Sequence, residues 1–286
     1  MSRGTAVSLT RYVCANCGTQ HDASAAPPPL CRICSDGRQY VAWAGQQWTT
    51  HDELLGRHTA RIEMDGELLG IGILPAFGIP QRALHVPTDA GNILWETTSL
   101  VTPAAVEALR ERGGVDLIVI SHPHFYASMV DWNDALGGVP ILLHAADRDW
   151  VERSSPNIEF WEGASLQLSP DVTLHNCPGH FPGSTVLHRR GPAGGRSILL
   201  AGDALHVAQD RRHVAFMYSV PNHVPSHPDS VRLIRERLEG IEFDDLYGFT
   251  WGLNILGDAR AAVDRSFERT LAAMGQPLVP SASPVG

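Results

Sequence analysis

The sequence has no apolar run as long as a membrane span, and its first residues lack the apolar core of a secretory signal peptide. Both absences predict a soluble, cytoplasmic protein without a membrane partner. Positive charge is also scarce, because 22 Lys and Arg residues oppose 31 Asp and Glu residues, for a formal net charge of −9. Nucleic-acid binding needs a positive field, so we expect a small-molecule substrate and no nucleic acid; a homodimer stays open.

Cysteine is scarce too, with five residues in the chain, but four of them fall within residues 14–34. "CANCG" supplies Cys14 and Cys17, and "CRIC" supplies Cys31 and Cys34. A reducing compartment disfavours disulfides, and two CxxC turns can complete a tetrahedron of thiolates around one ion. The segment resembles a zinc ribbon with rubredoxin-like knuckles.

This ribbon is too short to bury enough apolar surface for folding alone, so we expect a structural Zn²⁺ to hold it. Two other roles stay open for it. An iron ion in the same thiolates would make an electron relay, and docking of a partner protein is the other role. We place the ribbon at residues 1–45, a main domain at 46–275 and a disordered tail at 276–286.

The remaining chain is long and apolar enough for one large core. Thr50 and Glu53 have the spacing of a capping box, which predicts a short helix there. Further along, strand patterns alternate with amphipathic helices, which indicates an α+β sheet core covered by helices. We expect strands over residues 81–88, 92–98, 115–121, 139–147 and 196–203, and helices over 102–114, 126–138, 227–240 and 258–275.

A second group of metal-binding residues follows these strands. His122 and His124, in "SHPHFYAS", come directly after the apolar run "VDLIVI". His180 lies in the Gly/Pro turn "CPGHFPGST", and Asp203 ends the strand "SILLAGD". Strand ends of such sheets carry ligand sites, and three imidazoles with one carboxylate suit one divalent ion.

The order of these motifs resembles the metallo-β-lactamase-like hydrolase superfamily over roughly residues 60–270. "HPHFYA", "GHFPGS" and "AGD" match its first two histidines, its third histidine and its bridging carboxylate. The resemblance implies an αββα sandwich with the site at the inner loop ends. It also implies His122, His124, His180 and Asp203 as ligands of one Zn²⁺, Fe²⁺ or Mn²⁺.

The chain departs from the superfamily pattern at the second metal position. Tyr126 and Ala127 stand where that pattern has Asp and His, and "DLYGFTWGLN" offers Phe249 or Trp251 in place of the late histidine. Alanine has no donor atom and tryptophan offers only an N–H group, so neither binds a cation. We therefore predict a mononuclear centre.

The resemblance and the single centre predict a hydrolase acting on an ester, thioester, lactone or amide. Asp203 is expected as a fourth ligand or as a base, and Tyr126 as a donor to a developing oxyanion. The run after Asp203 is a candidate flap, whose polar residues would contact the substrate together with Trp251. These flap residues are Arg211, Arg212, His213 and Tyr218.

Two other functions stay open. Histidines with a carboxylate also suit iron(II), so the chain could be a mono-iron redox enzyme served by the ribbon. Loss of the second-metal residues would also fit a non-catalytic metal-binding module.

Overall fold

The structure, a computed structural model, describes residues 8–89, 91–193 and 195–275. In this part of the chain two large sheets face each other. The first has seven strands in sequence order, and the second has six in the order β10-β11-β12-β13-β18-β19. The strands of the first sheet are β3 (Thr59–Asp65), β4 (Leu68–Leu74), β5 (Ala83–Thr88), β6 (Gly91–Trp95), β7 (Leu117–Val119), β8 (Ile141–His144) and β9 (Ile158–Trp161). Those of the second are β10 (Ser165–Gln167), β11 (Val172–Asn176), β12 (Thr185–Arg189), β13 (Ile198–Leu200), β18 (Asp245–Tyr247) and β19 (Asn254–Leu256).

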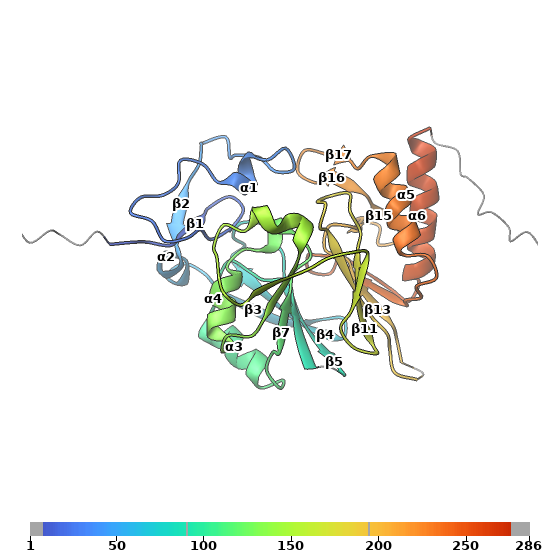
Figure 1. Cartoon of the computed structure of the whole chain (residues 1–286), viewed down its shortest axis with the longest axis horizontal. Helices are drawn as coiled ribbons and strands as arrows, with labels where there is room; N and C mark the ends of the chain where they lie inside the picture. Colours follow the sequence, from blue (N-terminus) through green and yellow to red (C-terminus); the bar gives the residue numbers. More distant parts are fainter. Residues whose placement is uncertain (1–7, 90, 194, 276–286) are drawn as a thin grey trace, which may run out of the picture.

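Apolar side chains from both sheets fill the space between them, among them Val86, Trp95, Val119, Leu187 and Leu200. Helices cover the outer faces (Figure 1). The first sheet packs against α3 (Pro103–Arg110) and α4 (Met129–Ala135), and the second against α5 (Pro228–Arg237) and α6 (Ala259–Ala273). This arrangement confirms the α+β class and the αββα sandwich.

The layers follow from the strand patterns. Strands buried on both faces, such as β13 with the sequence ILL, sit inside the sheet and carry apolar residues throughout. α3 begins after Thr102, whose side chain accepts from the Ala105 N–H, and has Pro103 at its first position. Among the described helices, none is both long enough and apolar enough to cross a membrane.

The four-cysteine segment forms its own small sheet, in which β1 (Tyr12–Cys14) pairs antiparallel with β2 (Trp48–Thr50). The second cysteine pair flanks and enters α1 (Arg32–Ser35). The expected capping box is present at the start of α2 (His51–Leu55). The division at residue 45 stays a prediction, since β2, which completes the ribbon's sheet, lies beyond it. The predicted disordered tail, 276–286, lies outside the described residues.

Most expected elements are shorter than the sequence indicated, and two of the differences lie at breaks near the metal-binding residues. The helix expected from residue 126 begins at Met129, because Pro123–Phe125 forms a 3-10 turn and Ala127 has a φ of 39°. The strand expected over 139–147 ends at His144, where the 3-10 helix η2 (Ala145–Trp150) begins. Both breaks lie at the same end of the sandwich.

Two small hairpins complete that end. One joins β14 (His206–Val207) to β15 (Val214–Ala215), and the other joins β16 (Met217–Ser219) to β17 (Val224–Pro225). In Figure 1 the blue ribbon extends over this end of the molecule as far as the β16–β17 hairpin.

Candidate metal centre

Four side chains that can bind a metal ion meet at this end of the sheets. His122 and His124 follow β7. His180 lies in the turn between β11 and β12, and Asp203 follows β13. Each offers one ligand atom, and the four atoms lie within 4.8 Å of one another. All four residues are buried, so the fold brings together the ligand set expected from the motifs.

Hydrogen bonds to the protein orient two of the three imidazoles, those of His122 and His180. Ser121 Oγ lies 2.7 Å from His122 Nδ1, which leaves His122 Nε2 buried and without a partner among the described residues. The Tyr218 carbonyl lies 2.9 Å from His180 Nδ1, and His180 Nε2 lies 2.9 Å from His124 Nδ1. Histidine ligands are commonly oriented in this way through their second nitrogen, so the residues fit a bound ion.

The charge states also suit a divalent cation. Burial, followed by the neighbouring His122, lowers the pKa of His180 to about 4. Burial also lowers the pKa of His124 well below its usual value. Burial alone would raise the pKa of Asp203, but the neighbouring imidazoles of His122 and His206, 3.5 and 3.8 Å away, outweigh this and hold it well below its usual range. Neutral imidazoles and an ionised carboxylate are the forms that bind metal ions.

A second buried carboxylate supports the loop beneath the histidines. Glu96 follows β6 with a φ of 67°, and its Oε2 accepts from the Ser121 N–H at 3.1 Å. Burial raises the pKa of Glu96 to about 8. Gly202 packs closely against Ser121, since a Cβ atom on residue 202 would lie 2.4 Å from Ser121 Oγ. A glycine before Asp203 therefore lets the carboxylate loop approach the histidine loop.

The cysteines form the other metal-binding group in the described chain. Cys14 Sγ lies 3.6 Å from Cys34 Sγ, and Cys17 Sγ lies 3.6 Å from Cys31 Sγ. A disulfide needs about 2.05 Å, whereas thiolates on one Zn²⁺ at about 2.3 Å lie about 3.8 Å apart. Gln46 Nε2 also donates to Cys14 Sγ at 3.2 Å, as expected for a thiolate acceptor. This geometry fits a four-thiolate metal site.

No protein-family model matches the chain. It is, however, 35% identical over 270 residues to YmaE of Bacillus subtilis strain 168, a protein described as uncharacterized. The alignment covers 93% of this chain and 98% of YmaE. The chain belongs to the YmaE family.

Solved structures show which fold this YmaE-family chain has. A B3 metallo-β-lactamase with an active-site glutamic acid matches with a TM-score of 0.50 and 14% identity, over 74% of this chain and 88% of that one. A Cronobacter sakazakii metallo-β-lactamase with a HARLDQ motif gives a TM-score of 0.48 at 17% identity, over 73% and 90% of the two chains. The first likeness shows the metallo-β-lactamase fold and confirms the resemblance drawn from the histidine motifs.

Aromatic and small residues stand at the positions where the superfamily pattern has its second-metal ligands. Phe249 stacks on Phe125 with ring centroids 5.6 Å apart and lies 5.4 Å from the ring of His206. Tyr126 is buried, and burial raises its pKa well above the usual value, so its hydroxyl keeps its proton. Ala127 contributes only its backbone. These side chains offer no anionic or imidazole ligand for a second ion.

Trp251, the other candidate for the late histidine position, lies elsewhere. Its indole ring covers Gly70 and Gly72 of β4, where added Cβ atoms would lie 2.6 and 2.7 Å from it. The Arg61 guanidinium stacks on the same ring at 4.1 Å. Of the two candidates, Phe249 is therefore the one near the centre, since it contacts His206 and Phe125, whose ring packs against His122.

The other predicted substrate contacts separate into two groups. Arg211, Arg212 and His213 lie in the turn of the β14–β15 hairpin, where His213 Nδ1 pairs with Asp210 Oδ2 at 2.7 Å. Within the described chain, no hydrogen bond or ion pair joins the side chains of this turn to the four metal-binding residues. Tyr218 does contact one of the metal-binding residues, but through its backbone carbonyl, which lies 2.9 Å from His180 Nδ1.

Two neighbours of the centre were missed from sequence. His206 follows Asp203 by three residues, and its Nδ1 lies 3.8 Å from Asp203 Oδ1, both atoms being buried. The spacing of "GDALH" was the available signal. Arg38 comes from the ribbon, and its Nε donates to the His180 carbonyl at 2.6 Å. No local pattern marks that contact, since the two residues are far apart in sequence.

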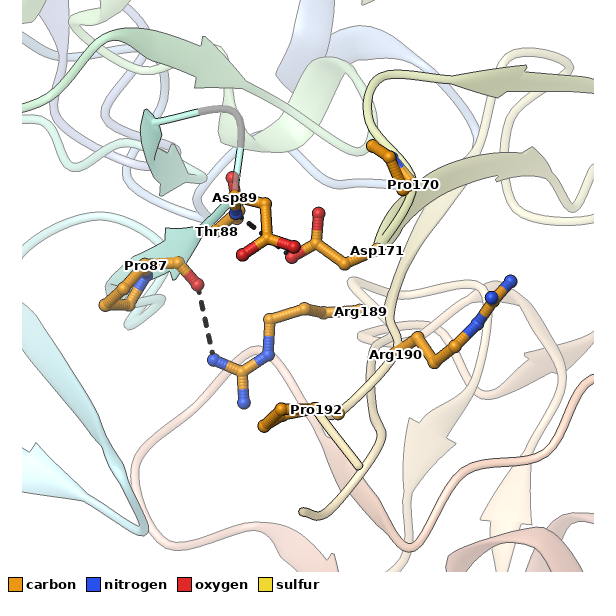
Figure 2. A pocket seen from close by; sticks show the side chains of 9 residues that line it. Pro87, Thr88, Asp89, Pro170, Asp171, Arg189, Arg190 and Pro192 are labelled. Atoms are coloured by element: carbon orange, nitrogen blue, oxygen red, sulfur yellow. Dashed lines mark hydrogen bonds between the residues drawn. The ribbon is translucent and has the colours of Figure 1, made fainter. Parts of the chain in front are cut away.

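A cavity of about 460 Å³ lies at the opposite end of both sheets, beside the β5–β6 turn and the start of β11 (Figure 2). Two of its charged side chains, Arg189 and Asp171, are already engaged. Arg189 pairs with Glu67 and reaches the Pro87 carbonyl, and the Asp89 N–H donates to Asp171 Oδ2 at 3.2 Å. The strand directions place this cavity away from the metal-binding histidines.

Proposed function

We propose that this YmaE-family chain is a mononuclear metal-dependent hydrolase acting on an ester, thioester, lactone or amide of a small cytoplasmic molecule. The observation that carries the proposal is the convergence of three imidazoles and one carboxylate within 4.8 Å at the sheet ends. The fold is that of metallo-β-lactamases, which supports hydrolysis as the class of reaction.

A divalent ion held by His122, His124 and His180 would supply a Lewis acid and bring the pKa of a bound water to about 7. The protein supplies the remaining groups. Asp203 stays ionised beside the imidazoles, so it can ligate the ion or accept the proton of the attacking water. Tyr126 stays protonated and is proposed to donate to the developing oxyanion.

The substrate contacts are proposed in outline. Phe249 forms an apolar wall beside His206, next to the carboxylate of Asp203. Arg211 and Arg212 remain proposed contacts for an anionic substrate group, since their turn belongs to the hairpin that begins at His206.

The first experiment measures metal content and hydrolysis of generic esters together. Wild-type protein is expected to hold one ion beyond that of the ribbon and to hydrolyse esters. His122→Ala and His180→Ala are expected to lose that ion and the activity. His188→Ala is the matched control, because His188, on β12, bonds the Glu242 carbonyl and lies outside the metal-binding group. Unchanged metal content in the first two variants would exclude these residues as ligands.

A mono-iron redox enzyme is the second candidate, and the ribbon's contact with His180 favours it. A four-thiolate iron centre so close to the second centre would be placed to pass electrons to it. Such a centre is coloured, whereas the zinc form is colourless. A colourless protein that is active after aerobic purification would exclude the relay and leave the hydrolase.

A further inference from the structure

The ribbon contacts both loops that carry the metal-binding histidines. On the first loop, the Gln20 N–H donates to the Ala127 carbonyl at 3.0 Å, three residues after His124. On the second loop, Arg38 Nε donates to the carbonyl of His180 at 2.6 Å. Residues far apart in sequence are thus fixed relative to each other through the ribbon.

Arg38 is itself held on several sides. Its guanidinium lies 4.3 Å from the Phe181 ring and 4.9 Å from the Tyr218 ring, and Nη1 pairs with Asp36 Oδ1 at 2.8 Å. The Arg38 carbonyl accepts from Ser219 Oγ at 2.9 Å. A side chain fixed by this many contacts loses little further entropy when it bonds His180, so the bond can hold the loop firmly.

Gln20 is fixed in a comparable way on the first loop. Its Nε2 donates to Asp131 Oδ2 at 2.7 Å, and its Oε1 accepts from the Arg153 guanidinium. Ala127 has a φ of 39°, an unusual value for a residue other than glycine. The bond from Gln20 therefore stabilises a bend that the chain would otherwise disfavour.

Both bracing residues depend on the cysteine centre for their position. Gln20 follows Cys17 by three residues, and Arg38 follows Cys34 by four. The fully buried apolar residues of the ribbon are the four cysteines, Ile33 and Val13, which are too few to hold it without a metal. Loading of the thiolate centre thus orders the segments that carry Gln20 and Arg38, so that both residues reach their partners on the main domain.

We propose that the ribbon is a brace for the second metal centre and that Arg38 is a positioning residue for His180. Occupation of the four-cysteine centre raises the affinity of the histidine centre for its ion, and by linkage the reverse also holds. The inference rests on the proposed function only in requiring that the histidine centre bind a metal ion.

Zn²⁺ binding to the histidine centre tests this, measured by competition with a chelator on full-length protein that retains one Zn²⁺ in its ribbon. Arg38→Ala is expected to weaken this binding about tenfold or more, as removal of a group supporting a metal ligand does. Arg38→Lys is expected to recover part of the affinity, because an ammonium group still donates. Ribbon zinc content and melting temperature are measured on each variant.

Arg32→Ala is the matched control. Arg32 also joins the ribbon to the main domain, through the Trp150 ring and the Asp149 carbonyl, but it does not bond a metal-binding loop. Unchanged affinity in Arg32→Ala with weaker binding in Arg38→Ala supports the inference. Wild-type affinity in Arg38→Ala, or an equal loss in Arg32→Ala, would overturn it. Failure of wild-type protein to bind a second Zn²⁺ would instead remove the proposed function as well.

Discussion

The four cysteines lie within residues 14–34, whereas the histidines and Asp203 come from three loops between residues 122 and 203. The first group is built from two local turns and has almost no apolar core of its own. The second is positioned by two large sheets that have their own core. This difference predicts that a bound metal ion stabilises the fold of the ribbon. In the sandwich, by contrast, the packed sheets position the ligands of the second metal ion.

The largest expected effect tests this contrast directly. Cys17→Ser removes a ribbon ligand, and we expect a loss of more than about 4 kcal/mol in the free energy of unfolding, since loss of a structural metal is among the most costly changes. His124→Ala should lose its ion while the sandwich stays folded. Urea denaturation with zinc analysis measures both. Equal destabilisation by the two variants would show that the ribbon and the sandwich do not differ in their dependence on metal.

A second substitution distinguishes an effect on catalysis from an effect on metal binding at the histidine centre. Tyr126→Phe removes only a hydroxyl, which we propose donates to the oxyanion. Ester turnover is expected to fall about 10²-fold, the usual cost of one such donor, with metal content unchanged. Steady-state kinetics on metal-loaded protein provide the measurement. Turnover equal to wild type would leave Tyr126 as a wall of the site only.

A third change probes a carboxyl near both regions. Burial raises the pKa of Asp147 to about 7, while a bond from the Gly183 N–H and the charge of Arg38 lower it. In the folded state this group keeps its proton up to about pH 7, whereas the unfolded state releases it near the ordinary aspartate pKa of 3.8. The unfolded state therefore binds fewer protons between these values, so this group costs stability as pH rises from about 4 to 7.

Asp147→Asn should remove that cost. The variant is expected to gain up to about 4 kcal/mol over wild type as the pH rises from 4 to 7, and nothing more above that range. Denaturation midpoints measured across the pH range give the result. Parallel curves for the two proteins would show that Asp147 does not titrate differently on folding.

The smallest effect concerns the sequence just after the ribbon. Thr50→Ala removes the capping box of α2 and is expected to cost about 1 kcal/mol of stability. Because α2 does not touch the histidine loops, Zn²⁺ affinity at the histidine centre should stay at the wild-type value. A drop in that affinity would mean that any disturbance near the ribbon reaches the second centre.

Sequence patterns predicted the parts of the molecule that are set locally. The two CxxC pairs, the α2 capping box and the strand ends carrying His122, His124 and Asp203 could be read directly. The αββα layers followed from the family resemblance, and the structure has them.

The remainder depends on tertiary contacts that no local pattern encodes. Glu96 looks like an ordinary strand-end residue until its carboxylate meets the Ser121 N–H beneath the histidines. The choice between Phe249 and Trp251 rested on a loop with no fixed register, and only the packing of Trp251 on β4 separates them. Arg38 reaches His180 because the ribbon folds over the sheet ends, although 142 residues separate the two in sequence.

Anomalous scattering at the zinc edge, from crystals grown with Zn²⁺, tests the central claim most directly. We predict two sites per chain. One lies about 2.3 Å from the four cysteine sulfurs, and the other about 2.0–2.1 Å from His122 Nε2, His124 Nδ1 and His180 Nε2. A single peak at the cysteines, with no peak between the three imidazoles at saturating Zn²⁺, would contradict this claim.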